Sequence, residues 1–547
     1  MATDTDSGFE SDSSLRWRKF KGRLFEILLF GSTLVGVVSL AVLFTVIGKD
    51  AFGPGAAEPA WYLLYSGTLV MPVSVYTLYV RRDPVSKAIN AKAFVTVFGS
   101  LVGSLVVFAL ADAVSPHDVA INLVFATLFP AVVLAYSRWT GGNHLTGPAL
   151  PVSVLVGLVV AQLLYGPIHS VLAILADWII FLVIVTIPAA AIMGYAVSGR
   201  WSRRAEFVVP ALVLAGALVT AGVALSQGID PALWVVLVSG FVAPVGVVYA
   251  DTLKQYSSGR IGLLGPAVLA GGILLGARIE SQFGITGLDA WLTPTLLLNS
   301  WSSFRPEQAG IYPQLIGSIL IIGVMALLAF PVGVGAAVYL EEYAPSTGWR
   351  GRLANALDVN ISNLAGVPSV VYGLLGFALF QNFFGIAPWL PPALGLESSL
   401  LISASVTLGL LILPIVIVSS QEALRSVPDE LREGSYGLGA SRWQTIRNVV
   451  LPEAVPGILT GTILALGRAI GETAPLVMIG VAATSFSPPS GLFNSATALP
   501  LQIFRSSYNA IPAYRTGVVA AASFVLLVTM LVMNGTAILI RNRYENN

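Results

Sequence analysis

Residues 25–47 read FEILLFGSTLVGVVSLAVLFTVI, a run in which Glu26 is the one charged residue. A helix of about 20 mostly apolar residues is long enough to cross the hydrocarbon core of a bilayer. A signal peptide is the alternative, but its apolar region covers only about 7–15 residues and precedes a small-residue cleavage site. We therefore interpret residues 25–47 as a retained membrane anchor. The run follows a basic cluster formed by Arg16, Arg18, Lys19, Lys21 and Arg23.

The composition of the whole chain agrees with this first segment. Hydrophobic residues make up 56% of the 547 residues and charged residues only 10%, whereas a soluble domain carries about 25% charged residues. The formal charge of +1 gives no reason to expect nucleic acid, and the absence of cysteine excludes disulfides and thiolate metal sites. Three single histidines do not predict a metal site. The chain is thus expected in the cell membrane, with lipid as its solvent and no cofactor.

Hydropathy windows predict an all-α bundle of about fourteen spans, because only helices of that length satisfy their backbone inside hydrocarbon. Eight candidates lie in the first half of the chain, at residues 25–47, 61–80, 93–111, 119–136, 151–166, 174–197, 207–226 and 232–250. Six follow, at residues 260–277, 313–340, 365–385, 399–420, 457–480 and 514–540. The candidate at 151–166 is shorter than a bilayer requires.

Basic residues orient this bundle, because cytoplasmic loops hold an excess of Lys and Arg. With the N-terminus inside, most of the 29 basic residues fall in loops predicted to be cytoplasmic. Gaining or losing one span would invert the bias in every later loop. We therefore predict that both termini are cytoplasmic, that loop 278–310 is external and that loop 419–456 is cytoplasmic.

A change in loop length divides the chain in two. We predict a cytoplasmic tail (1–24), an N-terminal accessory membrane domain of about eight helices (25–255) and a C-terminal core of about six helices (256–547). The first part has short loops and few residues suited to chemistry. The second part contains both long loops, and long loops between packed helices are usually functional or disordered.

The long cytoplasmic loop has the pattern of two short helices. Its sequence, QEALRSVPDELREGSYGLGASRWQTIRNVVLPEAVPG (421–457), predicts helices over 429–436 and 441–450. Ser441 is placed to cap the second helix, and Gly437 and Gly439 allow a tight turn between the two.

The turn and its flanks are expected to form a compact knob. Tyr436 and Leu438 project from it, and Pro452 and Pro456 are expected to end the second helix before the next span, because proline lacks the helical N–H donor. Such a knob offers a docking element to a cytoplasmic partner.

This loop resembles a motif of the permease subunits of bacterial and archaeal ABC importers, namely E-A-A, three residues, G, nine residues and I-x-L-P. The triplet here is E-G-S and valine replaces isoleucine, but every spacing is kept. The resemblance implies a coupling helix that fits a groove on a separate ATPase subunit. The chain has no G-x-x-x-x-G-K-[ST] loop for nucleotide phosphates, so it is not itself expected to be an enzyme. The residues concerned are Glu433, Gly434, Ser435, Tyr436, Leu438, Gly439, Leu451 and Pro452.

The next span, GILTGTILALGRAIGETAPLVMIG (457–480), contains Arg468 and Glu472. Four residues apart, they share one helix face. Charges inside a membrane are costly, so they face a partner, the bundle interior or a wet path. Arginine suits forked recognition of phosphate oxygens, and Glu472 would compete with substrate for it. A structural ion pair that never meets substrate is the equal alternative from physics alone.

The pattern R-x-x-G-E-T-A-P in this span resembles the PstA-type permeases of phosphate-specific ABC importers. The resemblance extends over about 262–544 and implies that Arg468, Glu472 and Thr473 lie on the phosphate pathway. Asn360 and Asn363 fall in a matching stretch and would supply hydrogen bonds there. Polar side chains more commonly bond helices to one another, and this second interpretation stays open.

The sequence therefore predicts the permease subunit of an ATP-driven importer for inorganic phosphate. The implied partners are a second, related permease subunit, P-loop ATPase subunits (two of them) and an extracytoplasmic phosphate-binding protein. The alternatives are a permease of the same superfamily for another oxyanion, such as molybdate or sulfate, and a fourteen-span secondary transporter driven by ions. A membrane enzyme has no support, since no nucleophile–base set or paired carboxylates are evident.

Overall fold

The computed structural model describes residues 12–140, 153–154, 156–158, 160–161, 163–198, 201, 204–256, 258–345, 347–384, 399–481 and 485–545. Within these ranges the fold is α-helical, and β-structure is limited to one isolated bridge between Leu400 and Ser495. In the described part of the chain, twelve helices are long and apolar enough to cross a membrane, or thirteen if one bent pair counts as a span. The predicted all-α membrane bundle is confirmed. The predicted spans correspond to these helices one by one except 151–166, which lies partly outside the described residues.

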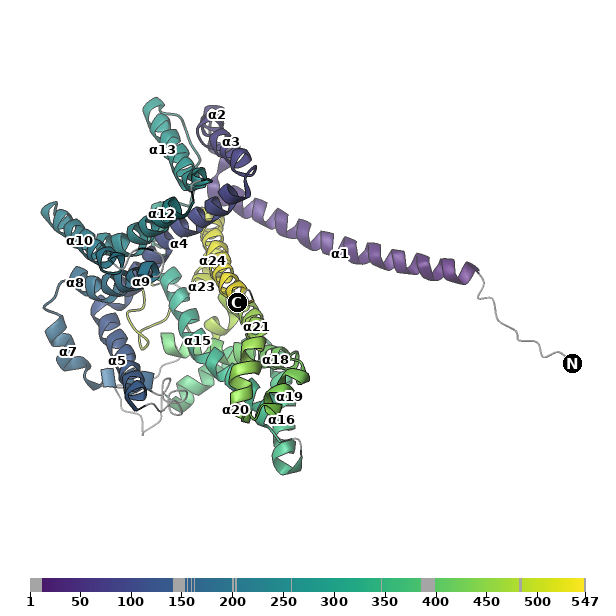
Figure 1. The fold of residues 1–547 in the computed structure, drawn as a ribbon. Helices are drawn as coiled ribbons and strands as arrows, with labels where there is room; N and C mark the ends of the chain where they lie inside the picture. The colour runs from purple at the N-terminus through teal and green to yellow at the C-terminus, as the bar shows by residue number, and fades with distance from the viewer. Residues whose placement is uncertain are drawn as a thin grey trace.

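The first half of the chain forms a layer of helices beside the second half (Figure 1). This layer consists of α2 (Pro59–Tyr65), α3 (Met71–Val80), α4 (Pro84–Val114), α5 (Pro116–Thr140), α7 (Tyr165–Leu172), α8 (Asp177–Phe181), α9 (Ile187–Ser198), α10 (Ala205–Ser226), α11 (Ala232–Leu237), α12 (Ala243–Gln255) and α13 (Gly265–Phe283). The remaining helices are α14 (Pro294–Leu298), α15 (Tyr312–Val338), α16 (Gly348–Ala365), α17 (Ser369–Phe377), α18 (Leu401–Arg425), α19 (Asp429–Gly437), α20 (Arg442–Thr445), α21 (Leu451–Ile470), α22 (Ala474–Met478), α23 (Leu499–Ser506) and α24 (Val519–Glu545).

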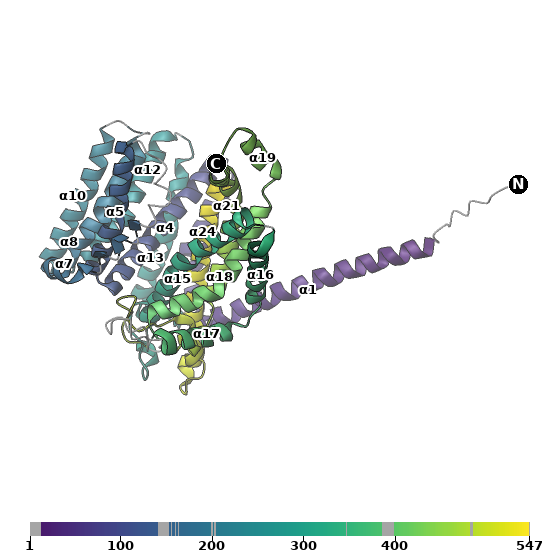
Figure 2. The same cartoon turned by 90° about the horizontal axis from the view of Figure 1, so that it is seen from below.

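Helix α1 (Asp12–Phe52) projects away from both halves, and none of its most apolar 18-residue window is buried (Figures 1 and 2). Its last residues do pack. Ala51 is fully buried in a cluster with Ile311 and Tyr514, and the ring of Phe52 meets the edge of Phe524 on α24 at 5.0 Å. Helix α1 is thus anchored to the second half of the chain.

Four spans contain a π-helical segment followed by a proline two residues later. The segments are Ser66–Val70, Leu182–Thr186, Val238–Val242 and Ile446–Val450, and the prolines are Pro72, Pro188, Pro244 and Pro452. A proline ring clashes with the carbonyl four residues earlier and supplies no N–H to it. The wider π-turn bonds to the fifth residue instead, as where Leu451 N–H donates to Ile446 O, so the helix continues.

The π-helical segment before Pro452 makes one prediction from the sequence wrong. Pro452 and Pro456 do not end the helix of the cytoplasmic loop, because the π-segment accommodates Pro452 and Pro456 lies inside α21. Residues Arg442–Ile470 form one continuous helix. The predicted span 457–480 also differs, since α21 ends at Ile470 and the short helix α22 begins only at Ala474.

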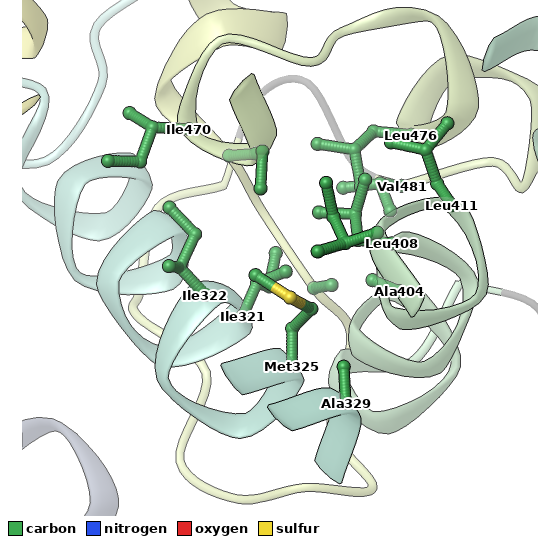
Figure 3. Packing of buried hydrophobic residues seen from close by; sticks show 14 of the residues in the cluster. Ile321, Ile322, Met325, Ala329, Ala404, Leu408, Leu411, Ile470, Leu476 and Val481 are labelled. Carbon is green, nitrogen blue, oxygen red and sulfur yellow. The ribbon is translucent and has the colours of Figure 1, made fainter. Parts of the chain in front are cut away.

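Helices α15 and α18 form the centre of the second half. Helix α18 is the most buried span, with 67% of its apolar window buried. Ile321 and Met325 of α15 point toward Ala404 and Leu408 of α18, as Figure 3 shows, and Ile322 and Leu411 belong to the same buried cluster. Lipid gives helices no hydrophobic reason to associate, so close approach between small residues is needed. Gly333 of α15 supplies it, because a Cβ there would overlap Val416.

Helices α16 and α17 meet at a sharp bend of 108°. Tyr372 closes it, since its hydroxyl donates a 2.8 Å hydrogen bond to the carbonyl of Leu364, and the side chain is 5% exposed. The predicted span at 365–385 therefore corresponds to the second arm of a broken pair, Gly348–Ala365 and Ser369–Gln381. In Figure 2, α17 lies at one end of the bundle, and α19 and the C-terminus lie at the other.

Candidate functional site

The loop predicted to be cytoplasmic folds as an exposed helical elbow, which we define as residues 429–441. Helix α19 begins after Pro428, and Asp429 and Glu430 in its first turn favour the positive end of the helix dipole. No residue of α19 is buried. Leu438 is 92% exposed and Tyr436 is 44% exposed. The predicted projection of these two side chains is present in the structure.

Two capping motifs build the turn of the elbow. Gly439 has φ +82°, a left-handed conformation suited to glycine. Its N–H donates to Tyr436 O at 2.9 Å, and the N–H of Ala440 donates to Ser435 O at 3.2 Å. This is the bond pattern of a Schellman C-cap.

The second motif begins α20 at the next residue. The side chain of Ser441 accepts from Gln444 N, and the side chain of Gln444 accepts from Ser441 N at 2.8 Å, which makes a capping box. A bond of 2.9 Å between the hydroxyls of Ser435 and Thr445 joins the two arms. The turn is thus fixed by local hydrogen bonds rather than by apolar packing.

Helix Arg442–Ile470 connects the elbow directly to the intramembrane ion pair. At about 1.5 Å per residue, this helix is roughly 43 Å long. Leu451 is half-buried against the cluster of Leu424, Val427 and Val450, whereas Pro452 lies exposed in the first turn of α21. These two motif residues therefore belong to the connecting helix and not to the elbow.

The predicted pair of Arg468 and Glu472 is present, but the helix ends between them. Arg468 lies in the last turn of α21, Gly471 caps the helix, and Glu472 follows it. The Nε of Arg468 lies 3.3 Å from Oε1 of Glu472. The Arg468 side chain is 45% exposed and that of Glu472 is 16% exposed. Among the described residues this is the one hydrogen bond of the Arg468 guanidinium, and it uses Nε rather than the two terminal nitrogens.

The other predicted pathway residues lie on two elements. Thr473 occupies the N-cap position of α22, where its hydroxyl donates to Gly471 O at 3.4 Å. Asn360 and Asn363 are exposed on α16, and the Asn360 amide donates to Ala356 O of its own helix at 2.7 Å. In the described part of the chain, no hydrogen bond or ion pair joins either asparagine to Arg468 or Glu472. Their role on the pathway stays a prediction.

The α17–α22 contact supports the break at Gly471. A Cβ at Gly373 of α17 would overlap the backbone of Pro475 and the side chain of Met478. Tyr372 beside it closes the bend of α16–α17. The bend of α16–α17 and the break of α21–α22 therefore lie against each other, with Arg468 at their junction. Irregular backbone at membrane depth is tolerated where it is buried or lines a cavity.

Sequence reasoning missed a polar network at the C-terminal ends of α15 and α18, which we call their inner ends because they are predicted to lie on the cytoplasmic side. It consists of Glu341, Glu342, Asp358, Gln421, Arg425 and Arg432. The sequence held one signal for it, because adjacent glutamates end one predicted span at the same predicted membrane face as Arg425 and Arg432. Their pairing depends on the long-range packing of α15 on α18.

A family model and individual relatives assign the chain to the same protein family. The model of the family described as binding-protein-dependent transport system inner membrane component matches residues 329–544. The chain is similar to phosphate transport system permease protein PstA 1 of Mycobacterium tuberculosis, at 39% identity over 43% of this chain and 72% of that one. It is similar to PstA of Mycobacterium leprae, at 38% identity over 42% of this chain and 68% of that one.

A related subunit and a solved structure also match. PstC of Haemophilus influenzae, a phosphate transport system permease protein, is 31% identical over 37% of this chain and 67% of that one. A structure of the inward-facing MetNI methionine ABC transporter covers 43% of this chain and 97% of that chain at 18% identity. Its TM-score is 0.34, which adds nothing to the assignment.

Proposed function

Because the chain belongs to the family of binding-protein-dependent transport permeases, as a PstA-type subunit, we propose that it carries inorganic phosphate into the cytoplasm as the membrane-spanning part of an ATP-driven importer. It is a multi-pass protein of the cell membrane. A permease of this family acts with an ATPase and a substrate-binding partner, so it is a transporter component rather than an enzyme.

One observation carries the proposal: a single helix connects the exposed elbow to Arg468. Leu438 and Tyr436 present apolar surface at the tip, where an ATPase subunit can bind them. A displacement of the elbow then moves the far end of helix Arg442–Ile470, where the guanidinium of Arg468 lies. Alternating access follows if this movement exposes Arg468 first to one side of the membrane and then to the other.

Arg468 suits an oxyanion for a geometric reason. Its Nε is held by Glu472, so the two terminal nitrogens remain available as a forked donor pair. The carboxylate of Glu472 competes with phosphate for the same guanidinium and so allows release. The name of the relatives, phosphate transport system permease, supports phosphate over molybdate or sulfate.

The finer assembly is part of the proposal. We infer two P-loop ATPase subunits, an extracytoplasmic phosphate-binding protein and a second, related permease subunit. The exposed face of α21, with Leu464 and Arg468, and the largely exposed helix α16 supply a surface for that second subunit. Thr473, Asn360 and Asn363 would then line the shared path.

We also propose a division of the chain that shifts the predicted accessory domain from 25–255 to 53–290. The N–H of Trp291 donates to Ala51 O at 2.9 Å, so the chain returns to the point where α1 ends. Within the segment that lies between Ala51 and Trp291, the Tyr65 hydroxyl donates a 2.8 Å hydrogen bond to Glu280, which binds α2 to α13. Residues 53–290 are then an insertion, and α1 completes the core with the helices from α14 onward.

The experiment is reconstitution of the whole complex in proteoliposomes, followed by measurement of ATP-dependent phosphate uptake. We expect uptake that requires ATP and the binding protein and that excess sulfate or molybdate does not inhibit. Uptake driven by an ion gradient without ATP would support the secondary transporter instead. Inhibition by another oxyanion, together with its own uptake, would assign the subunit to that anion.

A further inference from the structure

Arg432 ties α19 to the rest of the protein. Although α19 has no buried residue, the Arg432 side chain is only 17% exposed. Its Nη1 donates to the carbonyl of Val427 at 2.5 Å, and its Nη2 donates to the carbonyl of Leu424 at 2.8 Å. Leu424 lies in the last turn of α18, and Val427 follows that helix by two residues. The guanidinium therefore binds the backbone at and just after the C-terminal end of α18 to α19.

The same guanidinium also reaches α15. Nη2 of Arg432 lies 3.2 Å from Oε1 of Glu342, whose side chain is 9% exposed. Glu342 belongs to the π-segment Tyr339–Tyr343 that ends α15. A second carboxylate, Asp429, lies 3.1 Å from Nη1, but it is 88% exposed and on α19 itself. An exposed pair of this kind contributes little, whereas a buried carboxylate that loses its partner is strongly disfavoured.

Neighbouring bonds join the inner ends of α15 and α18 to the middle of α16. Arg425 of α18 forms two hydrogen bonds with Glu341, of 2.6 and 2.9 Å. Gln421 donates to Glu341 at 3.0 Å and to Asp358 of α16 at 2.7 Å. Because Glu341 and Glu342 are adjacent, Arg432 joins α19 to this whole network.

We propose that Arg432 is a positioning residue that makes α19 move together with the inner ends of α15 and α18. The inference rests on the proposed function, in which an ATPase subunit displaces the elbow. The elbow then has two outputs, one along helix Arg442–Ile470 to Arg468 and one through Arg432 to the central pair of helices. Without Arg432, α19 is held by the chain at Val427–Pro428, by the turn at Gly439 and by the bond from Ser435 to Thr445. None of these contacts joins α19 itself to α15, so α19 can tilt while α15 and α18 stay in place.

The test compares variants in the complete reconstituted transporter. Arg432→Ala removes every bond of the guanidinium, and Arg432→Lys keeps the charge but not the fork. Glu342→Gln removes the buried carboxylate at constant size. Asp429→Asn is the matched control, because it removes the other carboxylate that faces Arg432. ATP hydrolysis and phosphate uptake are measured in the same vesicles, together with the amount of assembled complex.

We expect Arg432→Ala to assemble and hydrolyse ATP while the phosphate moved per ATP falls roughly ten-fold, within the usual range of coupling between sites. Arg432→Lys and Glu342→Gln should fall by less, and Asp429→Asn should match the wild type. An unchanged ratio in Arg432→Ala would overturn the proposal. So would a loss of assembled complex with an unchanged ratio in the conservative variants, because that is a purely structural effect.

A spectroscopic readout separates this inference from the proposed function. The chain contains no cysteine, so Glu430→Cys and Tyr339→Cys place one spin label on α19 and one at the end of α15. We expect a narrow distance distribution that nucleotide leaves unchanged, and a broad one in Arg432→Ala. Equal distance distributions with and without the Arg432→Ala substitution would overturn the proposed role of Arg432, even if phosphate transport is confirmed. Absence of phosphate uptake by the wild type would instead refute the proposed function.

Discussion

Gly439→Ala should weaken the turn of the elbow by an amount that the backbone sets. Gly439 has φ +82°, and no atom lies within 4 Å of the position that a Cβ would take. The cost is therefore conformational and not steric, at about 1–2 kcal/mol for a non-glycine residue in the left-handed region. That free energy corresponds to a factor of roughly 5–30 in the population of the native turn.

Gly437→Ala is the matched control for this substitution. Gly437 is the last residue of α19, its φ is negative, and a Cβ there also has open space. Alanine should stabilise the helix there by up to about 1 kcal/mol, since glycine is the poorer helix former. The same chemical change two residues apart thus has opposite expected signs.

Hydrogen exchange over residues 433–441 measures both effects without any transport assay. The amides of residues 439 and 440 close the C-cap, so their exchange should be roughly 5–30 times faster in Gly439→Ala. Exchange in Gly437→Ala should be equal to or slower than in the wild type. Phosphate uptake per ATP should fall in the first variant only. Equal exchange in both variants would refute the reasoning about the turn.

The other predictions concern the ion pair, the insertion and the contact that supports the break. Arg468→Ala in an assembled complex should abolish phosphate uptake. Glu472→Gln should lower both the KM for phosphate and kcat, because the carboxylate that competes with phosphate is gone. Normal uptake in both variants would show that the pair is not on the pathway. Deleting residues 54–288 and joining the ends by a short linker should leave a core that inserts and transports, since the N–H of Trp291 lies 2.9 Å from Ala51 O; loss of uptake with normal assembly would show that the inserted helices take part in transport. Gly373→Val should disrupt the packing of α17 on Pro475 and reduce phosphate uptake at least as much as it reduces the amount of assembled complex. Size-exclusion chromatography measures the amount of assembled complex, so the two effects can be compared.

Much of this architecture follows from local sequence rules. Apolar windows locate the spans, because backbone amides must be paired inside hydrocarbon wherever the chain folds. The elbow was also predictable from local sequence, because Gly439 and Ser441 act through hydrogen bonds to near neighbours in the chain. The pairing of Arg468 with Glu472 follows from a separation of four residues.

Features that depend on distant contacts or on compensation were not predictable in this way. Pro452 reads as a helix end, but a π-turn before it lets the helix continue. The bend at 366–368 depends on Tyr372 reaching back to Leu364. Arg432 and Glu342 are 90 residues apart in sequence, and they meet only because α15 packs on α18. A local π-turn decides the conformation at Pro452, whereas at Tyr372 and Arg432 a contact between different helices decides it.

The most direct test of the account is the side of the membrane on which the elbow lies. Because the chain has no cysteine, Leu438→Cys introduces a single thiol at a position that is 92% exposed. A membrane-impermeant maleimide should label it in inside-out vesicles and not in right-side-out ones, and the bound ATPase subunit should protect it. Labelling from the outer side would contradict the claim that ATP-driven movement enters the protein at this elbow.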